Sequence, residues 1–460
     1  MLQTLKNAWA TKEIRNKLLF TLLILLLYRI GTVIPVPFVD TNNFSAAFGG
    51  TILDYMNILS GGSLEVATLF ALGVSPYINS SIIIQLLSVA FPKLGELGKS
   101  DAGKKKMNMI TRCVTIGLAI VTAIGYFFLL KNGGMLTSAA SGNDKIPGWI
   151  YATVIIACYV AGASIIMWLA ERINDKGLGN GISIILFANI VSTLPSSMIE
   201  LVNFVVLGFN SEDPVWLRAT GAIIFALFIL AAMLAITIFV IWVTGSERRI
   251  PIQYAKKVVG RKMYGGQSSN LPIKLNMTGV MPVIFASSLV SFVPTILALC
   301  GVTSSTDNFW GKLNKFLASD GWFYPVCLFV LIIAFAYFYT TISFNPIEVA
   351  NNLKKQGGAI PGIRQGRPTA DYISKILNKV TLVGALFLSI VAILPMIAGP
   401  HIFSHIIEWI LGVNTSYAAS IASQFTFGGT SLLIVVGVVL ETFRELEAQL
   451  TMRSYKGFLN

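Results

Sequence analysis

Few side chains in this chain have the types and spacing that chemistry needs. His401 and His405 lie four residues apart with Glu408 nearby, a spacing that one helix face can turn towards a metal ion. Two histidines without a fixed third ligand are weak grounds for such a site, and a solvated amphipathic stretch explains them better. The sequence contains no phosphate-binding Gly-rich loop ending in Lys and Ser or Thr, and no nucleophile paired with a base. It therefore predicts no enzyme, no metal and no cofactor.

Ionisable groups within the apolar stretches are equally scarce. Arg29, Glu171, Arg172, Glu200 and Glu441 lie near the ends of apolar stretches, where long side chains reach the membrane surface. An ion-coupled secondary transporter needs paired charges at mid-depth, because an isolated charge there is costly. Such a transporter is the second hypothesis for this chain, and the missing carboxylate or cation site counts against it.

The composition is that of a polytopic membrane protein. Of the 460 residues, 55% are hydrophobic and only 12% are charged, about half the charged fraction of a soluble domain. Apolar stretches of about 20 residues, the length that a membrane-spanning helix requires, predict ten spans. They lie near residues 18–36, 75–91, 113–130, 149–170, 182–206, 217–244, 274–300, 322–342, 380–399 and 430–446.

Basic residues set the predicted orientation. Most of the 34 Lys and Arg residues fall on segments that the positive-inside rule then places in the cytoplasm, together with both termini. Anionic lipid of the inner leaflet accounts for part of the net charge of +13. The predicted divisions are a cytoplasmic N-terminus (1–17), two halves of five helices each (18–206 and 207–446) and a cytoplasmic tail (447–460).

Residues 61–92 form one apolar run with a break at Gly73 to Pro76. A continuous helix of this length would exceed the roughly 30 Å of a hydrocarbon core. The run therefore predicts a short re-entrant half-helix at about 63–72, joined through glycines to a full span. The break has an echo, since Gly73, Val74, Pro76, Ile78 and Ser81 recur in type and spacing as Gly279, Val280, Pro282, Ile284 and Ser287.

A second echo links the fifth and tenth spans. Gly181 and Ser183 stand before three aliphatic residues, as do Gly429 and Ser431. Because each half has an odd number of spans, matched helices run in opposite directions, the arrangement that places a site near the membrane midplane. The predicted fold is an all-α polytopic membrane protein with ten transmembrane helices in two inverted, pseudo-symmetric halves of five, plus the half-helix.

The echoed segments carry aliphatic side chains at mid-depth. Ordinary helix packing is one explanation. The other is a hydrophobic constriction that excludes ions by dewetting yet deforms around a passing polypeptide, with the half-helix as a movable stopper. The six residues of this predicted pore ring are Val74, Ile78, Ile182, Leu186, Ile284 and Ile434.

Two polar residues of the echoed helices have two explanations as well. Gln85 and Asn276 could each make a hydrogen bond between packed helices. Alternatively, they line a polar seam between the second and seventh spans that opens sideways to lipid. Both explanations stay open on the sequence alone.

Two inner loops are long and basic. Residues 245–273 combine a strand-like alternation with glycines that can turn a hairpin, and residues 343–378 have helix-like ends around a tip rich in Gly and Pro. A solvated positive-inside loop is the simpler interpretation. A docking surface for ribosomal RNA or an acidic protein is the other, and a ribosome receptor without a pore is the third hypothesis for the whole chain.

Four stretches together resemble a known family. They are Asn345-Pro346-x-Glu348-x-Ala350-x-Asn352-Leu353-Lys354-Lys355-x-Gly357-x-x-x-Pro361-Gly362-Ile363-Arg364-x-Gly366, Gly179 to Ile185, Pro76-Tyr77-Ile78 before Ile82 to Leu87, and Gly428 to Val435. In these residues the chain resembles the SecY family of channel subunits of the bacterial protein translocase. The resemblance implies a protein-conducting channel of the cytoplasmic membrane, driven by a partner motor or the ribosome.

The resemblance also assigns roles by position. It makes the six aliphatic residues a pore ring, and places a lateral gate with Gln85 and Asn276 between the second and seventh helices. The implied plug consists of Gly61, Gly62, Ser63, Leu64, Glu65, Val66, Ala67, Thr68, Leu69, Phe70, Ala71 and Leu72. The implied motor- and ribosome-binding residues are Arg248, Arg249, Lys256, Lys257, Arg261, Lys262, Lys354, Lys355 and Arg364. The implied partners are SecE, SecG, the motor SecA, the ribosome, signal peptides, nascent chains and anionic lipid.

Overall fold

The computed structural model describes most of the chain. The described residues are 2–39, 57, 60–97, 100–132, 135–136, 147–209, 215–254, 257–259, 262–264, 268–299, 309, 311–312, 323–411 and 428–456. Helices dominate, and strands occur between α10 and α11 and again after α14.

Each of the ten predicted spans coincides with one helix. In the N-terminal half these are α2 (Lys12–Gly31), α5 (Ser75–Ala90), α7 (Asp101–Asn132), α8 (Gly148–Lys176) and α9 (Gly181–Phe209). In the C-terminal half they are α10 (Val215–Gly245), α11 (Met281–Leu299), α13 (Phe323–Ser343), α15 (Arg367–Ala398) and α18 (Gly428–Lys456). Among the described residues, α7, α8, α9, α10, α13 and α15 satisfy both the length and the hydropathy that a membrane crossing requires.

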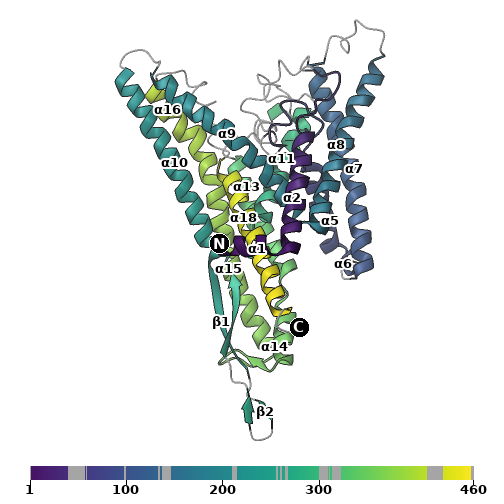
Figure 1. Cartoon of the computed structure of the whole chain (residues 1–460), viewed down its shortest axis with the longest axis vertical. Coiled ribbons are helices and arrows are strands. Elements are labelled where there is room, and N and C mark those ends of the chain that lie inside the picture. The colour runs from purple at the N-terminus through teal and green to yellow at the C-terminus, as the bar shows by residue number, and fades with distance from the viewer. Residues whose placement is uncertain are drawn as a thin grey trace.

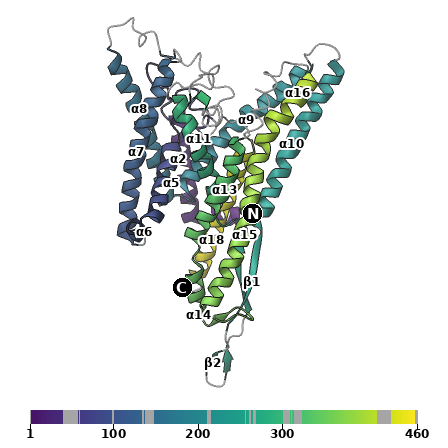
Figure 2. The same ribbon diagram turned by 180° about the vertical axis from the view of Figure 1, so that it is seen from behind.

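Shorter helices flank these spans. They are α1 (Leu2–Ala10), α6 (Pro92–Leu97), α14 (Pro346–Lys355), the π-helical turn η1 (Gly399–Phe403) and α16 (Ser404–Leu411). Helices α7 and α8 form one side of the molecule and α10 with α16 the opposite side, with α2, α11, α13 and α18 between them (Figure 1, and from behind in Figure 2). The halves meet where α11 contacts α5 and α7, and where α18 contacts α9.

The two basic loops form one structure beyond the helices. Strand β1 (Glu247–Tyr254) pairs antiparallel with β4 (Ser268–Lys274), from Glu247 opposite Lys274 to Gln253 opposite Ser268. The other edge of β1 pairs with β5 (Gly358–Ala359) of the second loop. A small hairpin of β2 (Lys257–Val259) and β3 (Lys262–Tyr264) extends the first loop away from the bundle (Figure 1). The predicted hairpin is therefore correct, whereas its predicted turn glycines at 260, 265 and 266 lie outside the described residues.

Alternation along β1 explains how this sheet is anchored. Ile250 and Ile252 are buried, whereas Arg249 and Pro251, which alternate with them along the strand, are exposed. A strand with one solvated face requires this alternation. The buried isoleucines pack in a cluster with Ile273 of β4 and with residues of the second loop and α15, namely Leu353, Ile360, Ile373 and Leu377. The two loops thus share a single hydrophobic core.

The predicted half-helix at 63–72 is wrong. Residues 61–74 form consecutive turns, whereas the described residues Asn57 and Ser60 upstream have helical backbone. Gly61, Gly62 and Ala67 adopt positive φ of 71°, 82° and 48°, which a right-handed helix does not allow. The backbone makes short-range turn bonds and two bonds outside the segment, where Leu69 N donates to Ile34 O and Val36 N donates to Ala67 O. Length and hydrophobicity therefore identified a re-entrant segment but not its conformation.

Candidate functional site: the aliphatic cluster between the two halves

The two echoed breaks have the same local geometry. Gly73 and Gly279 have positive φ of 56° and 64°, a region that glycine enters at little cost. The Val74 carbonyl accepts hydrogen bonds from the amides of the third and fourth residues downstream, at 3.0 Å each, and the Val280 carbonyl does the same at 3.1 and 3.2 Å. Each break therefore turns the chain and starts a helix one residue later.

The likeness extends upstream of the glycines. Leu69 and Leu275 each lie four residues before a break, and a Cβ added at Gly162 of α8 or Gly384 of α15 would overlap the carbonyl oxygen of the corresponding leucine. Helices α8 and α15 are the fourth spans of their halves. A glycine on the fourth helix of each half thus lets the backbone before the break pack directly against that helix. The sequence did not reveal this contact, although Leu69 and Leu275 extend the echo.

The second echo also starts helices. Gly181 opens α9 and Gly428, one residue before the predicted Gly429, opens α18. Asn174 Oδ1 accepts a hydrogen bond from Gly181 N at 2.7 Å, and Asn180 Oδ1 accepts one from Ile182 N at 3.1 Å. These caps satisfy amides that the first turn of a helix leaves free. They also fix the start of the helix that carries Ile182 and Leu186.

The six aliphatic residues of the predicted pore ring share one large hydrophobic cluster that contains residues of both halves. Five of them are at least 96% buried in a single hydrophobic cluster, and Ile182 packs against its edge. They come from two helices of each half, together with the turn before α5: Val74, Ile78, Ile182, Leu186, Ile284 and Ile434. The turn before α11 packs closely on α18, since a Cβ added at Gly437 of α18 would overlap the side chain of Val280. The structure thus brings together residues that the sequence separates by up to 360 positions.

The predicted plug segment packs against the N-terminal half. Leu64, Ala67, Ala71 and Leu72 join a second hydrophobic cluster with residues of α7 and α8. The Tyr126 hydroxyl donates to the Leu64 carbonyl at 2.6 Å. This cluster is separate from the one that contains the six aliphatic residues. Most of the segment's packing contacts are therefore with the N-terminal half.

Phe70 and its neighbour Leu69 connect the segment to the aliphatic cluster. Phe70 belongs to the same cluster as Val74 and stacks on Tyr28 with ring centroids 5.4 Å apart. Its ring occupies the space beside Gly31, where a Cβ would overlap it. The segment from 61 to 72 therefore touches both the aliphatic cluster and α2.

The one charge in the segment is paired by hydrogen bonds. Asn57 Nδ2 donates to Glu65 Oε2 at 3.0 Å, while Glu65 N donates to Asn57 Oδ1 at 3.0 Å. The Ser60 hydroxyl accepts from Leu64 N at 3.2 Å. These bonds join the helical residues upstream to the turns, so that Glu65 is bound within its own loop.

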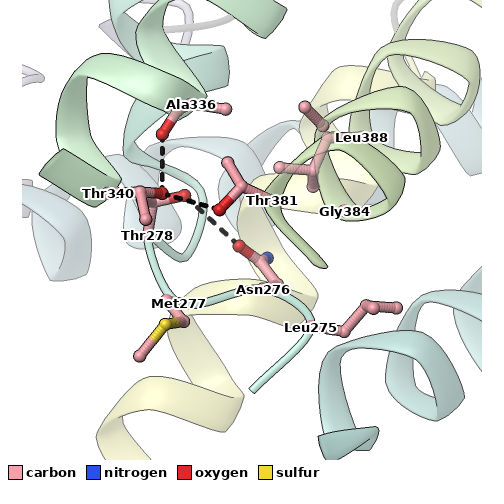
Figure 3. A pocket seen from close by; sticks show the side chains of 10 residues that line it. Leu275, Asn276, Met277, Thr278, Ala336, Thr340, Thr381, Gly384 and Leu388 are labelled. Carbon is pink, nitrogen blue, oxygen red and sulfur yellow. Dashed lines mark hydrogen bonds between the residues drawn. The ribbon is translucent and has the colours of Figure 1, made fainter. Parts of the chain in front are cut away.

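The two polar residues predicted for a gate lie in different surroundings. The side-chain oxygen of Gln85 on α5 accepts a hydrogen bond from the Tyr339 hydroxyl of α13, and its nitrogen donates to Ser81 Oγ at 3.0 Å. Asn276 is 94% buried beside Thr278, in a small pocket that α13 and α15 line with side chains such as Thr340 (Figure 3). Among the described residues, no hydrogen bond joins Gln85 to Asn276.

The basic residues of the loops are mostly exposed. Arg248, Arg249, Lys354, Lys355 and Arg364 are exposed to solvent, and Glu247 pairs with Arg249 at 2.7 Å. Lys257 and Lys262 lie in the small hairpin, whereas Lys256 and Arg261 lie outside the described residues. Since β1 and β5 pair, the basic residues of the two loops lie on one connected structure.

Local bonds hold the tip that carries Arg364. The Arg364 carbonyl accepts from the Thr369 hydroxyl at 2.8 Å, and Gln365 Nε2 donates to the Gly358 carbonyl at 3.2 Å. Gly362 and Gly366 on either side have positive φ of 80° and 99°. The tip is therefore a defined turn.

At the other end of the sheet, burial and the nearby Arg444 lower the pKa of Lys274.

Metal-binding groups do not converge in the described part of the chain. No cluster of three His, Cys, Asp or Glu residues occurs there. His405 Nδ1 lies 3.6 Å from Glu408 Oε2 on α16, and both side chains are substantially exposed.

These features define a helical membrane protein of channel type, built from two related halves around an aliphatic cluster. Comparison with known proteins identifies the family. The model of the SecY family matches residues 68–443, and the protein translocase subunit SecY of Streptomyces galbus is 40% identical over 467 residues, covering 100% of both chains. The chain belongs to the SecY family. This membership confirms the prediction of a protein-conducting channel rather than an enzyme.

Solved structures share the fold. A SecY channel whose plug domain stabilises its closed state has a TM-score of 0.60 at 18% identity, over 94% of this chain and 92% of that one. Sec61 of the canine ribosome-channel complex from the endoplasmic reticulum has a TM-score of 0.57 at 16% identity, over 94% and 92%. At these identities the likeness concerns the fold.

Proposed function

We propose that unfolded secretory polypeptides cross the bacterial cytoplasmic membrane through this chain, and that transmembrane segments leave it sideways into lipid. The observation that carries the proposal is that six aliphatic residues from both halves share one hydrophobic cluster, five of them buried and Ile182 partly buried. Such a ring excludes ions by dewetting and makes no fixed polar bonds that a passing chain would have to break. The channel is passive, and a partner motor or the ribosome supplies the energy.

The segment Gly61 to Leu72 acts as the plug. Its contacts with Tyr126 and Tyr28 lie within the N-terminal half, so it can leave its seat without separating the halves. The related channel whose plug domain stabilises the closed state supports this role by analogy.

The lateral gate lies between α5 and α11, where the two halves touch. Gln85 and Asn276 are its proposed polar residues, and signal peptides would enter between these helices. The segment that leaves is apolar, so exit towards lipid is favourable once the helices part.

The basic surface of the two loops is the proposed docking site. Its nine residues are those named above, with Arg364 at the tip, and its ligands are SecA and the ribosome. Exposed Lys and Arg on an ordered sheet favour an RNA or acidic protein surface, and the canine relative is part of a ribosome-channel complex. This sheet and both termini would face the cytoplasm, with SecE, SecG and anionic lipid as partners within the membrane.

A stalled secretory chain tests the pore directly. A photocrosslinking residue at Ile284 is expected to label a polypeptide held in transit, because Ile284 lies in the aliphatic cluster. The same probe at Trp242 of α10, which is 69% exposed on the bundle surface, is the matched control and should not label it. Labelling confined to probes in the two basic loops would contradict the pore.

The docking surface is tested by Arg364→Glu. Export driven by the motor is expected to fall at least tenfold while the protein still assembles in the membrane, because the exposed side chain makes no packing contribution. Arg367→Glu, an equal change of charge at an exposed residue three positions away, is the control. Normal export with Arg364→Glu would remove this residue from the docking surface.

A further inference from the structure

A small polar pocket lies beside the turn that precedes α11. Asn276 and Thr278 of this turn line it together with Thr340 of α13 and Thr381 of α15. Figure 3 shows the polar ends of these four side chains directed towards one another. The cavity has a volume of about 10 Å³, which is enough space for one water molecule.

The side chain of Asn276 uses only part of its hydrogen-bonding capacity. It is 94% buried, and its oxygen accepts from the Thr278 hydroxyl at 3.5 Å. Its nitrogen can donate two hydrogen bonds, and no described residue accepts one from it. A buried polar group without a partner costs free energy, so an acceptor in the pocket would stabilise this side chain.

The threonines on the opposite side of the pocket also have capacity to spare. The Thr340 hydroxyl donates to the Ala336 carbonyl at 2.8 Å and accepts from the Thr381 hydroxyl at 3.4 Å. A good bond between hydroxyls is about 2.5–3.0 Å long, so the hydroxyls of Thr381 and Thr278 are only weakly bound. Among the described residues, no hydrogen bond joins the pair on the turn to the pair on the two helices.

We propose that one ordered water molecule binds in this pocket and joins the turn before α11 to α13 and α15. The water accepts from the Asn276 amide and donates to the oxygens of Thr340 and Thr381, which gives about three bonds, the usual number for a buried water. A cation does not suit the site, because the amide hydrogens would repel it. The partly exposed residues Met277 and Thr278 offer a path of entry.

The bound water gives the start of α11 a second attachment. The first is the backbone bond from Leu275 N to Ser246 O at 3.0 Å. Through the water, Asn276 holds the same turn from inside the C-terminal half, where α13 and α15 lie. This inference holds whatever crosses the channel, since it depends only on the pocket and its four polar side chains.

A density map of the full-length protein tests the site directly. At a resolution that reveals other buried waters in the same helices, we expect a peak within hydrogen-bonding distance of Asn276 Nδ2 and of a threonine hydroxyl. A map that shows other buried waters and no peak here would overturn the proposal. A peak that disappears when sodium in the buffer is replaced by choline would overturn it as well, because the ligand would then be a cation.

Thermal unfolding of two variants tests whether the water bridges the two sides. Thr381→Val and Asn276→Leu should each lower the unfolding temperature by about 1–3 °C, the shift expected from one lost hydrogen bond in a chain of this size. The double variant should lose no more than the larger single loss, because both changes remove the same bridge. Additive losses would overturn the bridge. Thr341→Val is the matched control and should leave the temperature unchanged, because the exposed Thr341 hydroxyl donates to the Tyr337 carbonyl of its own helix at 2.8 Å.

Discussion

The two breaks of the chain, at Gly73 and Gly279, share their local geometry and differ in what they connect. Both have a glycine with positive φ, a valine that caps the following helix and a leucine carbonyl against a glycine of the fourth span. Upstream of Gly73 lies a segment of turns inside one half, whereas upstream of Gly279 lies β4, paired along its whole length with β1.

The two segments that precede the breaks therefore differ in how firmly they are attached. The segment before Gly73 is held by a few backbone bonds to residues 34–36 and by side-chain packing. The segment before Gly279 is held by the ladder of a sheet with its own hydrophobic core. The repeated sequence therefore specifies how each helix begins, while the attachments lead us to expect that the segment before Gly73 is displaced more easily than the segment before Gly279.

The largest expected effect comes from filling the two glycine contacts. Gly384→Val should lower the free energy of unfolding by about 3 kcal/mol or more, because Leu275 is fixed on both sides by the sheet and α11. Gly162→Val creates the same overlap with Leu69, but here we expect the turns to be displaced, because only a few backbone bonds hold them. It should keep the fold and increase ion leak through proteoliposomes.

Thermal unfolding and leak measured on the same preparations distinguish these outcomes. Gly117→Val is the control, because a Cβ at this helical glycine meets nothing within 4 Å. If Gly162→Val unfolds as readily as Gly384→Val and leaks no more than wild type, the N-terminal joint is as firmly anchored as the C-terminal one.

A smaller and equal effect is expected at the breaks themselves. Gly73→Ala and Gly279→Ala should each lower the free energy of unfolding by about 1–2 kcal/mol, the cost of positive φ for a residue with a Cβ. Both sites have room, since the nearest atoms are Ser60 Cβ at 3.5 Å and Glu441 Oε2 at 3.9 Å. Thermal unfolding of both variants checks this, with Gly245→Ala, where a Cβ meets no atom and φ is not positive, as control. Unequal costs would mean that the two turns are not equivalent.

Much of this architecture follows from local sequence. Apolar length placed each span on a helix, and the Gly-Val-x-Pro echo identified two equivalent turns, because hydrophobic length and glycine conformation are local properties. The start of α14 is also fixed locally, since Asn345 Oδ1 accepts from Ile347 N at 3.1 Å.

What the sequence missed depends on tertiary partners. The plug segment is apolar enough for a helix, but it forms turns and exchanges two backbone bonds with a distant segment, from Leu69 N to Ile34 O and from Val36 N to Ala67 O. Nothing local to Tyr339 indicates a partner 254 positions away at Gln85. The pairing of β1 with β5, which unites the two basic loops, involves only two residues of the second loop, too few for a strand pattern to reveal.

The smallest expected effect tests how firmly the segment before Gly73 is held in place. Tyr126→Phe removes the hydrogen bond to the Leu64 carbonyl and should cost about 1 kcal/mol, seen as a modest rise in ion leak. Tyr159 packs edge-on against Tyr126, with centroids 5.1 Å apart, and its buried hydroxyl has no hydrogen-bond partner among the described residues. Tyr159→Phe should therefore leave leak and stability unchanged or slightly improve stability. Equal leak from the two variants would mean that packing in this cluster, and not the bond to Leu64, holds the segment before Gly73 in place.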